Sequence, residues 1–108
     1  MNFQHKNLAN GRWQEFSLME QMANIGSEIE RALNWRKKDK KYSQMAFERA
    51  LELFDLTMAD PKNKTRLMEI ARVREVLCDY FLGNNNYSST EQNWKDYFYL
   101  FGYAVASR

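Results

Sequence analysis

Few side chains of this chain offer acid–base, nucleophilic or metal chemistry. Among its 108 residues, His5 is the only histidine and Cys78 the only cysteine, so zinc sites built from several of these residues are excluded. Cys78 falls within an apolar helical face, which is typical of a small core residue and not of a nucleophile. The glycines are isolated and no E-x-x-H pattern occurs, so phosphate-binding loops and two-metal carboxylate sites are not expected. We therefore predict that the protein is not an enzyme and uses no cofactor and no metal.

Two arginines fall among apolar positions, where a charged side chain needs a partner. Arg74 falls on the apolar face of its expected helix, and Arg49 lies between apolar neighbours. Arginine suits a buried or interfacial ion pair, because its planar fork can meet a carboxylate with two hydrogen bonds. We expect Arg74 to pair with a carboxylate from another helix, and the candidates are Glu48, Glu52 and Glu28. We interpret this pair as structural and not catalytic.

The positive charge of the chain is concentrated in one segment. The net charge is +2, but the segment RKKDKK has five cations and one anion, hence +4, which leaves 11 cations and 13 anions elsewhere. Cations neutralise phosphates and a nearby aromatic ring can stack on an unpaired base, so this segment is a candidate site for RNA or DNA. The candidate residues are Arg36, Lys37, Lys38, Lys40, Lys41 and Tyr87. Alternatively, the lysines complement a helix dipole and keep a loop soluble.

Four segments have helical periodicity and none alternates like a strand. The first helix is predicted to follow Ser17, which has Glu20 at the spacing of a capping box. The others are predicted over about 42–58, 62–82 and 89–106, the last with Ser88 and Glu91 as a second capping box. Short loops between helices of similar length favour an all-α, antiparallel up-down-up-down four-helix bundle over 17–108. In this topology the first and third connections, RKKDKK and GNNNYSS, lie at the same end. Residues 1–16 are expected to be an irregular N-terminal tail or a cap.

The last predicted helix is apolar on too many sides for an outer helix of a bundle. Its segment KDYFYLFGYAVA has one apolar stripe, whereas other aromatic residues point away from that stripe. Such a surface favours self-association, with Tyr97, Tyr99, Leu100 and Tyr103 as candidate interface residues. Alternatively, the N-terminal tail covers this helix with Phe3, Leu8 and Trp13. Base stacking and insertion at a membrane surface are weaker alternatives.

The sequence has no features of a membrane or secreted protein. No apolar run approaches the roughly 18 residues that span a bilayer, and the first residues lack the apolar core of a signal peptide. We expect a cytoplasmic protein with no membrane partner.

Four strings of the sequence, HKNLANGRW, MEQMANIGSEIERALNWR, FERALELFDLTMAD and REVLCDYFLGNNNYSST, together resemble a group of small uncharacterised bacterial proteins. At the level of fold, the chain is similar to the four-helix proteins encoded in intervening sequences of large ribosomal RNA. It is also similar to the accessory protein of diversity-generating retroelements, a basic ring-forming bundle that binds nucleic acid and a reverse transcriptase. The helical ribonuclease toxins require a histidine four to six residues after an arginine, and no histidine follows Arg72 or Arg74.

Three functional hypotheses follow. The first is a non-catalytic helical-bundle interaction protein that forms a homo-oligomer through its aromatic C-terminal helix, with a further protein partner as an option. The alternative is a nucleic-acid-binding accessory factor that uses the basic end on RNA or single-stranded DNA, as the resemblance implies, together with a reverse transcriptase. A toxin-type ribonuclease is a distant third.

Overall fold

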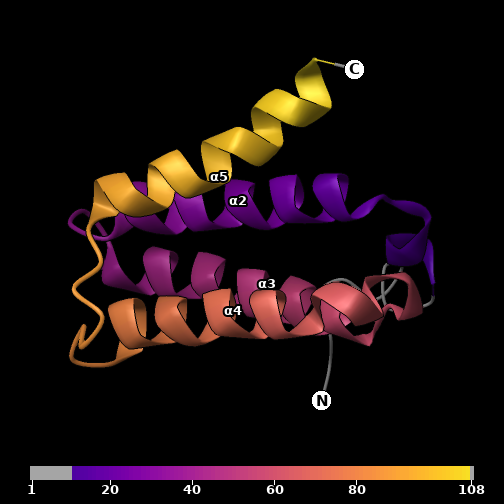
Figure 1. Ribbon diagram of the computed structural model, residues 1–108. Helices are drawn as coiled ribbons and strands as arrows, with labels where there is room; N and C mark the ends of the chain where they lie inside the picture. Colours follow the sequence, from indigo (N-terminus) through magenta and orange to yellow (C-terminus); the bar gives the residue numbers. More distant parts are fainter. Residues whose placement is uncertain (1–10, 108) are drawn as a thin grey trace.

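The computed structural model describes residues 11–107. A short 3₁₀ helix, η1 (Arg12–Glu15), precedes α2 (Leu18–Trp35) and α3 (Lys40–Ala59), and a second 3₁₀ helix, η2 (Pro61–Arg66), precedes α4 (Leu67–Leu82) and α5 (Glu91–Ala106). Successive α-helices run in opposite directions (Figure 1), so the predicted all-α four-helix bundle is confirmed. The connections α2–α3 and α4–α5 lie at the same end, as the sequence predicted.

Side-chain caps explain where the helices begin. The capping box predicted at Ser17 and Glu20 is present, since each side chain binds the backbone N–H of the other. Asp39 caps α3 by accepting from the N–H groups of Lys41 and Tyr42. These side chains satisfy backbone donors that have no partner within the helix.

The second predicted capping box is wrong. The residues that form it are Thr90 and Asn93, two positions later than Ser88 and Glu91. Ser88 has a φ of 55°, whereas an N-cap residue takes an extended backbone. The third helix also begins later than predicted, because the segment after Asp60 first forms the 3₁₀ turn η2.

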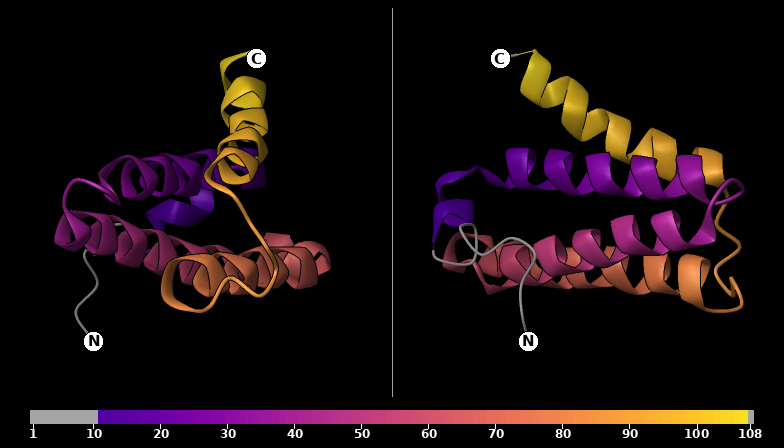
Figure 2. Two further views of the ribbon diagram at one scale, coloured as in Figure 1. Left: turned by 90° about the vertical axis from the view of Figure 1, so that its left-hand side faces the viewer. Right: turned by 180° about the vertical axis from the view of Figure 1, so that it is seen from behind.

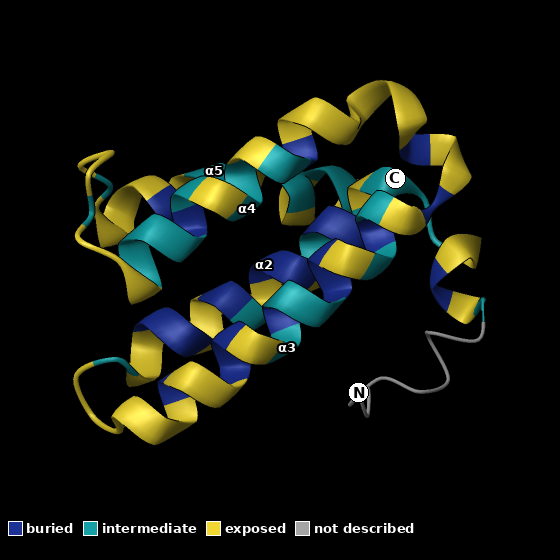
Figure 3. Cartoon of the chain, turned by 90° about the horizontal axis from the view of Figure 1, so that it is seen from below, coloured by how far each residue is buried: buried dark blue, intermediate teal, exposed yellow. Residues whose placement is uncertain are grey.

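Two inner helices and two outer helices make up the bundle. α2 lies between α5 and α3, and α4 packs on the far side of α3 (Figures 1 and 2). The inner helices α2 and α3 each bury seven residues, whereas the outer helices α4 and α5 each bury two. The buried positions follow the facing sides of α2 and α3 (Figure 3). Phe47, Phe54, Ile25, Ile29 and Leu77 are the largest fully buried apolar side chains.

A buried polar cluster closes the end of the bundle where η1 and η2 meet. The indole N–H of Trp13 donates to the hydroxyl of Thr57 at 2.9 Å. The amide of Gln21 donates to the carbonyl of Trp13 at 3.0 Å and to the carboxylate of Asp60 at 2.9 Å, and its oxygen accepts from Asn63 at 2.8 Å. We call these residues, Trp13, Gln21, Thr57, Asp60 and Asn63, the polar cluster. Its hydrogen bonds join η1, α2, α3 and η2 into one unit.

No helix within residues 11–107 is long and apolar enough to cross a membrane.

Candidate interaction surface on the last helix

Helix α5 is anchored to α2 through its first half. Trp94 and Phe98 are its two buried residues, and both belong to the core. Phe98 lies directly against Gly26 of α2, because a Cβ atom built on this glycine would be 2.9 Å from the Cβ of Phe98. Only a residue without a side chain permits this approach, so Gly26 allows α2 and α5 to come close together at Phe98.

Beyond this contact α5 turns away from α2 and an open groove separates them. The divergence is visible in Figure 1, where the C-terminal half of α5 rises from the bundle. A Cβ atom built on Gly102 would have no neighbour within 4 Å. The groove has a volume of about 520 Å³ and extends along both helices, from Leu33 and Gln92 at one end to Ala23 and Ala106 at the other. Small residues, among them Ala23, Gly102 and Ala106, line the part beyond Phe98.

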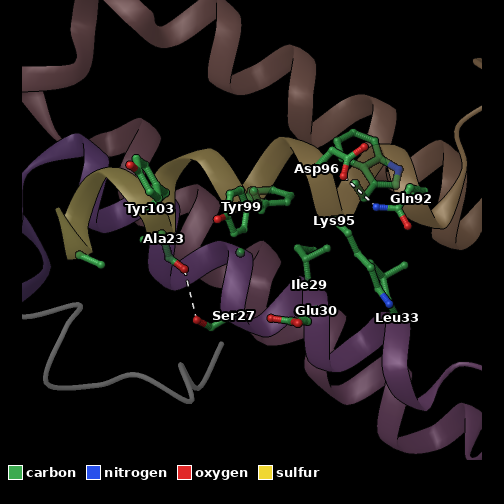
Figure 4. A pocket seen from close by; sticks show the side chains of 15 residues that line it. Ala23, Ser27, Ile29, Glu30, Leu33, Gln92, Lys95, Asp96, Tyr99 and Tyr103 are labelled. Atoms are coloured by element: carbon green, nitrogen blue, oxygen red, sulfur yellow. Dashed lines mark hydrogen bonds between the residues drawn. The ribbon is translucent and has the colours of Figure 1, made fainter.

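Two exposed tyrosines contribute to the α5 wall of this groove. Tyr99 and Tyr103 lie on α5 opposite Ala23 and Ser27 of α2 (Figure 4). Their rings are stacked with centroids 6.1 Å apart, which holds the two side chains as one ridge. Charged residues line the groove as well, with Glu30 on α2 and Lys95 on α5.

The structure exposes three of the four interface residues that were predicted on α5. Tyr99 is 66% exposed, Leu100 64% and Tyr103 61%. Tyr97 is half-buried instead, because its ring meets Phe98 and Phe101 edge-on at centroid distances of 5.0 and 5.3 Å. Burial raises the pKa of Tyr97, and the nearby negative charge of Glu69 adds to this increase.

The alternative prediction was that three residues of the N-terminal tail, Phe3, Leu8 and Trp13, cover α5. Trp13 does not cover α5, since it is buried in the polar cluster beside Thr57 and its ring packs on Phe16. Phe3 and Leu8 lie outside the described residues. Residues 12–15, which the sequence placed in the irregular tail, form η1.

The basic segment contains one fixed cation and four exposed ones. The guanidinium of Arg36 lies 4.3 Å from the ring centroid of Tyr80 and donates to the carbonyl of the same residue at 3.0 Å. Arg36 is thus half-buried against α4. Lys37, Lys38, Lys40 and Lys41 are exposed. None of the five cations is within ion-pair distance of a carboxylate in the part of the chain that the structure describes.

Tyr87 folds back onto α4. Its backbone N–H donates to Asp79 at 3.0 Å, its hydroxyl lies 3.4 Å from a carboxylate oxygen of Glu75, and Arg72 lies 5.5 Å from its ring centroid. These three partners all belong to α4. The structure therefore brings the two loops to one end, but it engages the Tyr87 ring with α4.

Arg74 forms the predicted ion pair between helices, but the predicted partners are wrong. Arg74 does pair with a carboxylate of another helix, but with Asp55 at 3.1 Å, and not with the predicted candidates Glu48, Glu52 or Glu28. Phe47 stacks on Phe81 between the same two helices. Because α3 and α4 are antiparallel, residues that follow Phe47 on α3 face residues that precede Phe81 on α4. Asp55, eight residues after Phe47, therefore meets Arg74, seven residues before Phe81.

The other predicted pair residues have different roles. Glu28 pairs with Arg49 across α2 and α3 at 3.1 Å and with Arg31 on its own helix. Glu48 accepts from Gln44 at 3.3 Å. Both groups of the Arg74–Asp55 pair are partly exposed, so its contribution to stability is of the order of 1 kcal/mol or less.

Cys78 is half-buried against the core, in line with its interpretation as a small core residue. Burial raises the pKa of its thiol above the ordinary value, although the neighbouring Arg74 opposes this effect. A thiol in this environment is a poor nucleophile. Within residues 11–107 there is no group of three or more histidine, cysteine or carboxylate side chains that could hold a metal ion.

The polar cluster was not predicted from the sequence. A signal for it was present, because Gln21 precedes Ile25 by four residues and thus lies on the apolar face of α2. A polar residue on such a face needs partners. The segment ADPKN, where the helices predicted over 42–58 and 62–82 meet, supplies Asp60 and Asn63 to the cluster.

Comparison of the chain with protein-family models, curated proteins and solved structures gives no match.

Proposed function

We propose that this protein is a non-catalytic interaction module that self-associates through the C-terminal half of α5. The observation that carries this proposal is the exposure of Tyr99, Leu100 and Tyr103, each more than 60% exposed on a helix of 16 residues. Large apolar side chains gathered on a surface are typical of protein interfaces. Tyrosine suits such a surface because its ring is buried well while its hydroxyl tolerates water.

The chemistry of α5 supports a protein partner. From Tyr97 to Ser107 the chain has no charged residue, so this segment offers no strong attraction for phosphates or metal ions. Charged residues are depleted in the centres of interfaces.

Sedimentation equilibrium over a range of concentrations tests the proposal. We expect the wild-type chain to form a complex whose population rises with concentration, and Tyr99→Ser/Tyr103→Ser to shift the chain to the monomer. Tyr42→Ser is the matched control, because Tyr42 is 53% exposed but lies on α3. A wild-type chain that stays monomeric at its highest soluble concentration would refute self-association.

A second candidate function is binding of single-stranded RNA or DNA at the basic end. The absence of ion pairs from Arg36, Lys37, Lys38, Lys40 and Lys41 within the described residues supports it, because unpaired cations remain available to phosphates. The fixed orientation of Arg36 adds a preorganised donor.

This second function predicts a salt-dependent affinity for a single-stranded RNA oligonucleotide. Replacing the four lysines 37, 38, 40 and 41 with alanine is expected to weaken binding and to flatten the dependence of affinity on salt. Lys64→Ala is the control, since Lys64 is an exposed cation on η2. Equal affinities for the fourfold variant and the control would exclude this site.

A further inference from the structure

We infer that the occupant of the groove between α2 and α5 is the α5 helix of a second copy of this chain. This inference rests on the proposed self-association and adds its geometry. In the inferred dimer the two α5 helices lie antiparallel between the two α2 helices, so that each copy fills the groove of the other.

The shape of the surface leaves room for a further helix. Moving along α5 away from the contact between Gly26 and Phe98, the gap to α2 opens, and a Cβ atom built on Gly102 would have no neighbour within 4 Å outside its own turn of helix. On the α2 side the groove is lined there by Ala23, with Ser27 at the exposed edge (Figure 4), and both side chains are too small to fill the gap. The groove therefore has room for the side chains of another helix.

The surface is complementary to itself. The same surface carries both a hollow, at Ala23, Ser27 and Gly102, and a ridge, formed by the stacked rings of Tyr99 and Tyr103. An interface with twofold symmetry uses the same patch on both subunits, so ridge and hollow must both lie within it. This surface meets that condition, since the ridge of one copy can enter the hollow of the other.

The distribution of charge also favours a second copy as the occupant. The ridge and the hollow contain no charged residue, whereas Glu30, Lys95 and Asp96 line the groove beside them. An uncharged segment can therefore enter the hollow without burying a charge there, and the segment from Tyr97 to Ser107 of the chain itself is uncharged. The +4 segment RKKDKK lies at the opposite end from the raised half of α5 (Figure 1), so antiparallel pairing keeps the two positive segments apart.

Crosslinking between two differently tagged chains tests this geometry. In a Cys78→Ser background, one chain carries Ser27→Cys and the other carries Tyr103→Cys, and the mixture is oxidised with diamide. A disulfide between the two tags can form only between chains. We expect most of the mixed dimer to crosslink, because the partner's Tyr103 lies beside Ser27. Glu75→Cys on α4 replaces Ser27→Cys in the matched control and is expected to give at least tenfold less product.

The outcomes separate this inference from the function on which it rests. If the chain sediments as a dimer but crosslinks only through Leu100→Cys, the other flank of α5 is the interface; self-association then stands and the inferred geometry is wrong. If the chain sediments as a monomer, both are wrong. If, in that monomer, alkylation of Ser27→Cys becomes fast only after removal of residues 1–10, the occupant is the N-terminal segment of the chain itself.

Discussion

The polar cluster and the groove lie on the same central helix, α2, but they are built in opposite ways. At the polar cluster the side-chain amide of Gln21 and the NH₂ group of Asn63 make hydrogen bonds that join η1, α2, α3 and η2. At the groove, α5 meets α2 through two buried residues and then leaves it. The indole N–H of Trp94 is buried there without an acceptor among the described residues.

This difference separates what holds the chain together from what the chain offers to partners. A buried polar group contributes to a unique structure only when its hydrogen bonds are complete, because each missing bond costs about 1–3 kcal/mol. The polar cluster meets this requirement and has no surface left for a partner. The groove has unused apolar surface on both walls, so further burial there can still stabilise a complex.

The largest expected effect is at the centre of the polar cluster. Trp13→Ala removes a side chain that is 2% exposed, together with its hydrogen bond to Thr57, and should lower the free energy of unfolding by about 3–5 kcal/mol. Trp35→Ala is the matched control: Trp35 is 39% exposed and stacks on Tyr42, so its loss should cost no more than about 1.5 kcal/mol. Urea denaturation measures both. Equal losses for the two variants would mean that the cluster does not hold this end closed.

The next largest effect on stability is expected at Asp60, whose charge also makes the free energy of unfolding depend on pH. Burial alone would raise the pKa of Asp60, but hydrogen bonds from Lys62 and Gln21 and the charge of Lys62 outweigh it and lower the pKa below the ordinary value of 3.8. Because the folded-state pKa is below the unfolded one, ionised Asp60 stabilises the fold above pH 3.8. That stabilisation is lost as the pH falls through the lowered pKa.

Asp60→Asn tests this linkage by denaturation at several pH values. At pH 7 the variant should lose about 1.5–3 kcal/mol, because hydrogen bonds to a charged group are removed. Below the lowered pKa the gap between variant and wild type should shrink. Glu75→Gln, which alters an exposed carboxylate on α4, is the control and should show no such convergence. A gap that stays constant from pH 7 to pH 2 would contradict the assigned role of Asp60.

The two glycines at the groove should respond in opposite directions. Gly26→Ala places a Cβ atom 2.9 Å from the Cβ of Phe98, so α5 must shift. Overpacking lowers the free energy of unfolding by about 1–3 kcal/mol. Alanine in place of glycine within a helix raises it by about 1 kcal/mol, so the expected net loss is about 1 kcal/mol. Gly102→Ala meets open space and should gain about 0.5–1 kcal/mol.

Both glycine variants are best measured in the Tyr99→Ser/Tyr103→Ser background, so that association does not contribute to the free energy of unfolding. Destabilisation by Gly102→Ala in this background would mean that the gap between α2 and α5 is closed within one chain.

The smallest effect on stability is expected at the ridge. Tyr103→Ser should change the free energy of unfolding of the monomer by no more than about 0.5 kcal/mol, because the side chain is 61% exposed. It should nevertheless weaken self-association in sedimentation experiments. Denaturation of dilute protein, monitored by circular dichroism, measures the first quantity. A loss above about 1.5 kcal/mol in the dilute chain would show that Tyr103 is part of the core.

Much of the fold followed from local patterns. The apolar periodicity of Leu18 to Leu33 and the capping box at Ser17 were enough to predict α2, because both depend on residues within one or two turns. The capping box at Thr90 was missed because Ser88 and Glu91 have the same spacing, and only the backbone of the loop distinguishes the two pairs. The exposed face of α5 was predicted at Tyr99, Leu100 and Tyr103 for the same local reason.

The sequence by itself determined the helices, the charged segment and the unusual apolar surface of α5, since these depend on residues close together in the chain. The tertiary structure decided which groups meet: Arg74 with Asp55, Gln21 with Asp60 and Asn63, and Gly26 with Phe98. Such pairings depend on the register and crossing angle of packed helices. These in turn are set by the summed fit of many side chains, which no single segment specifies.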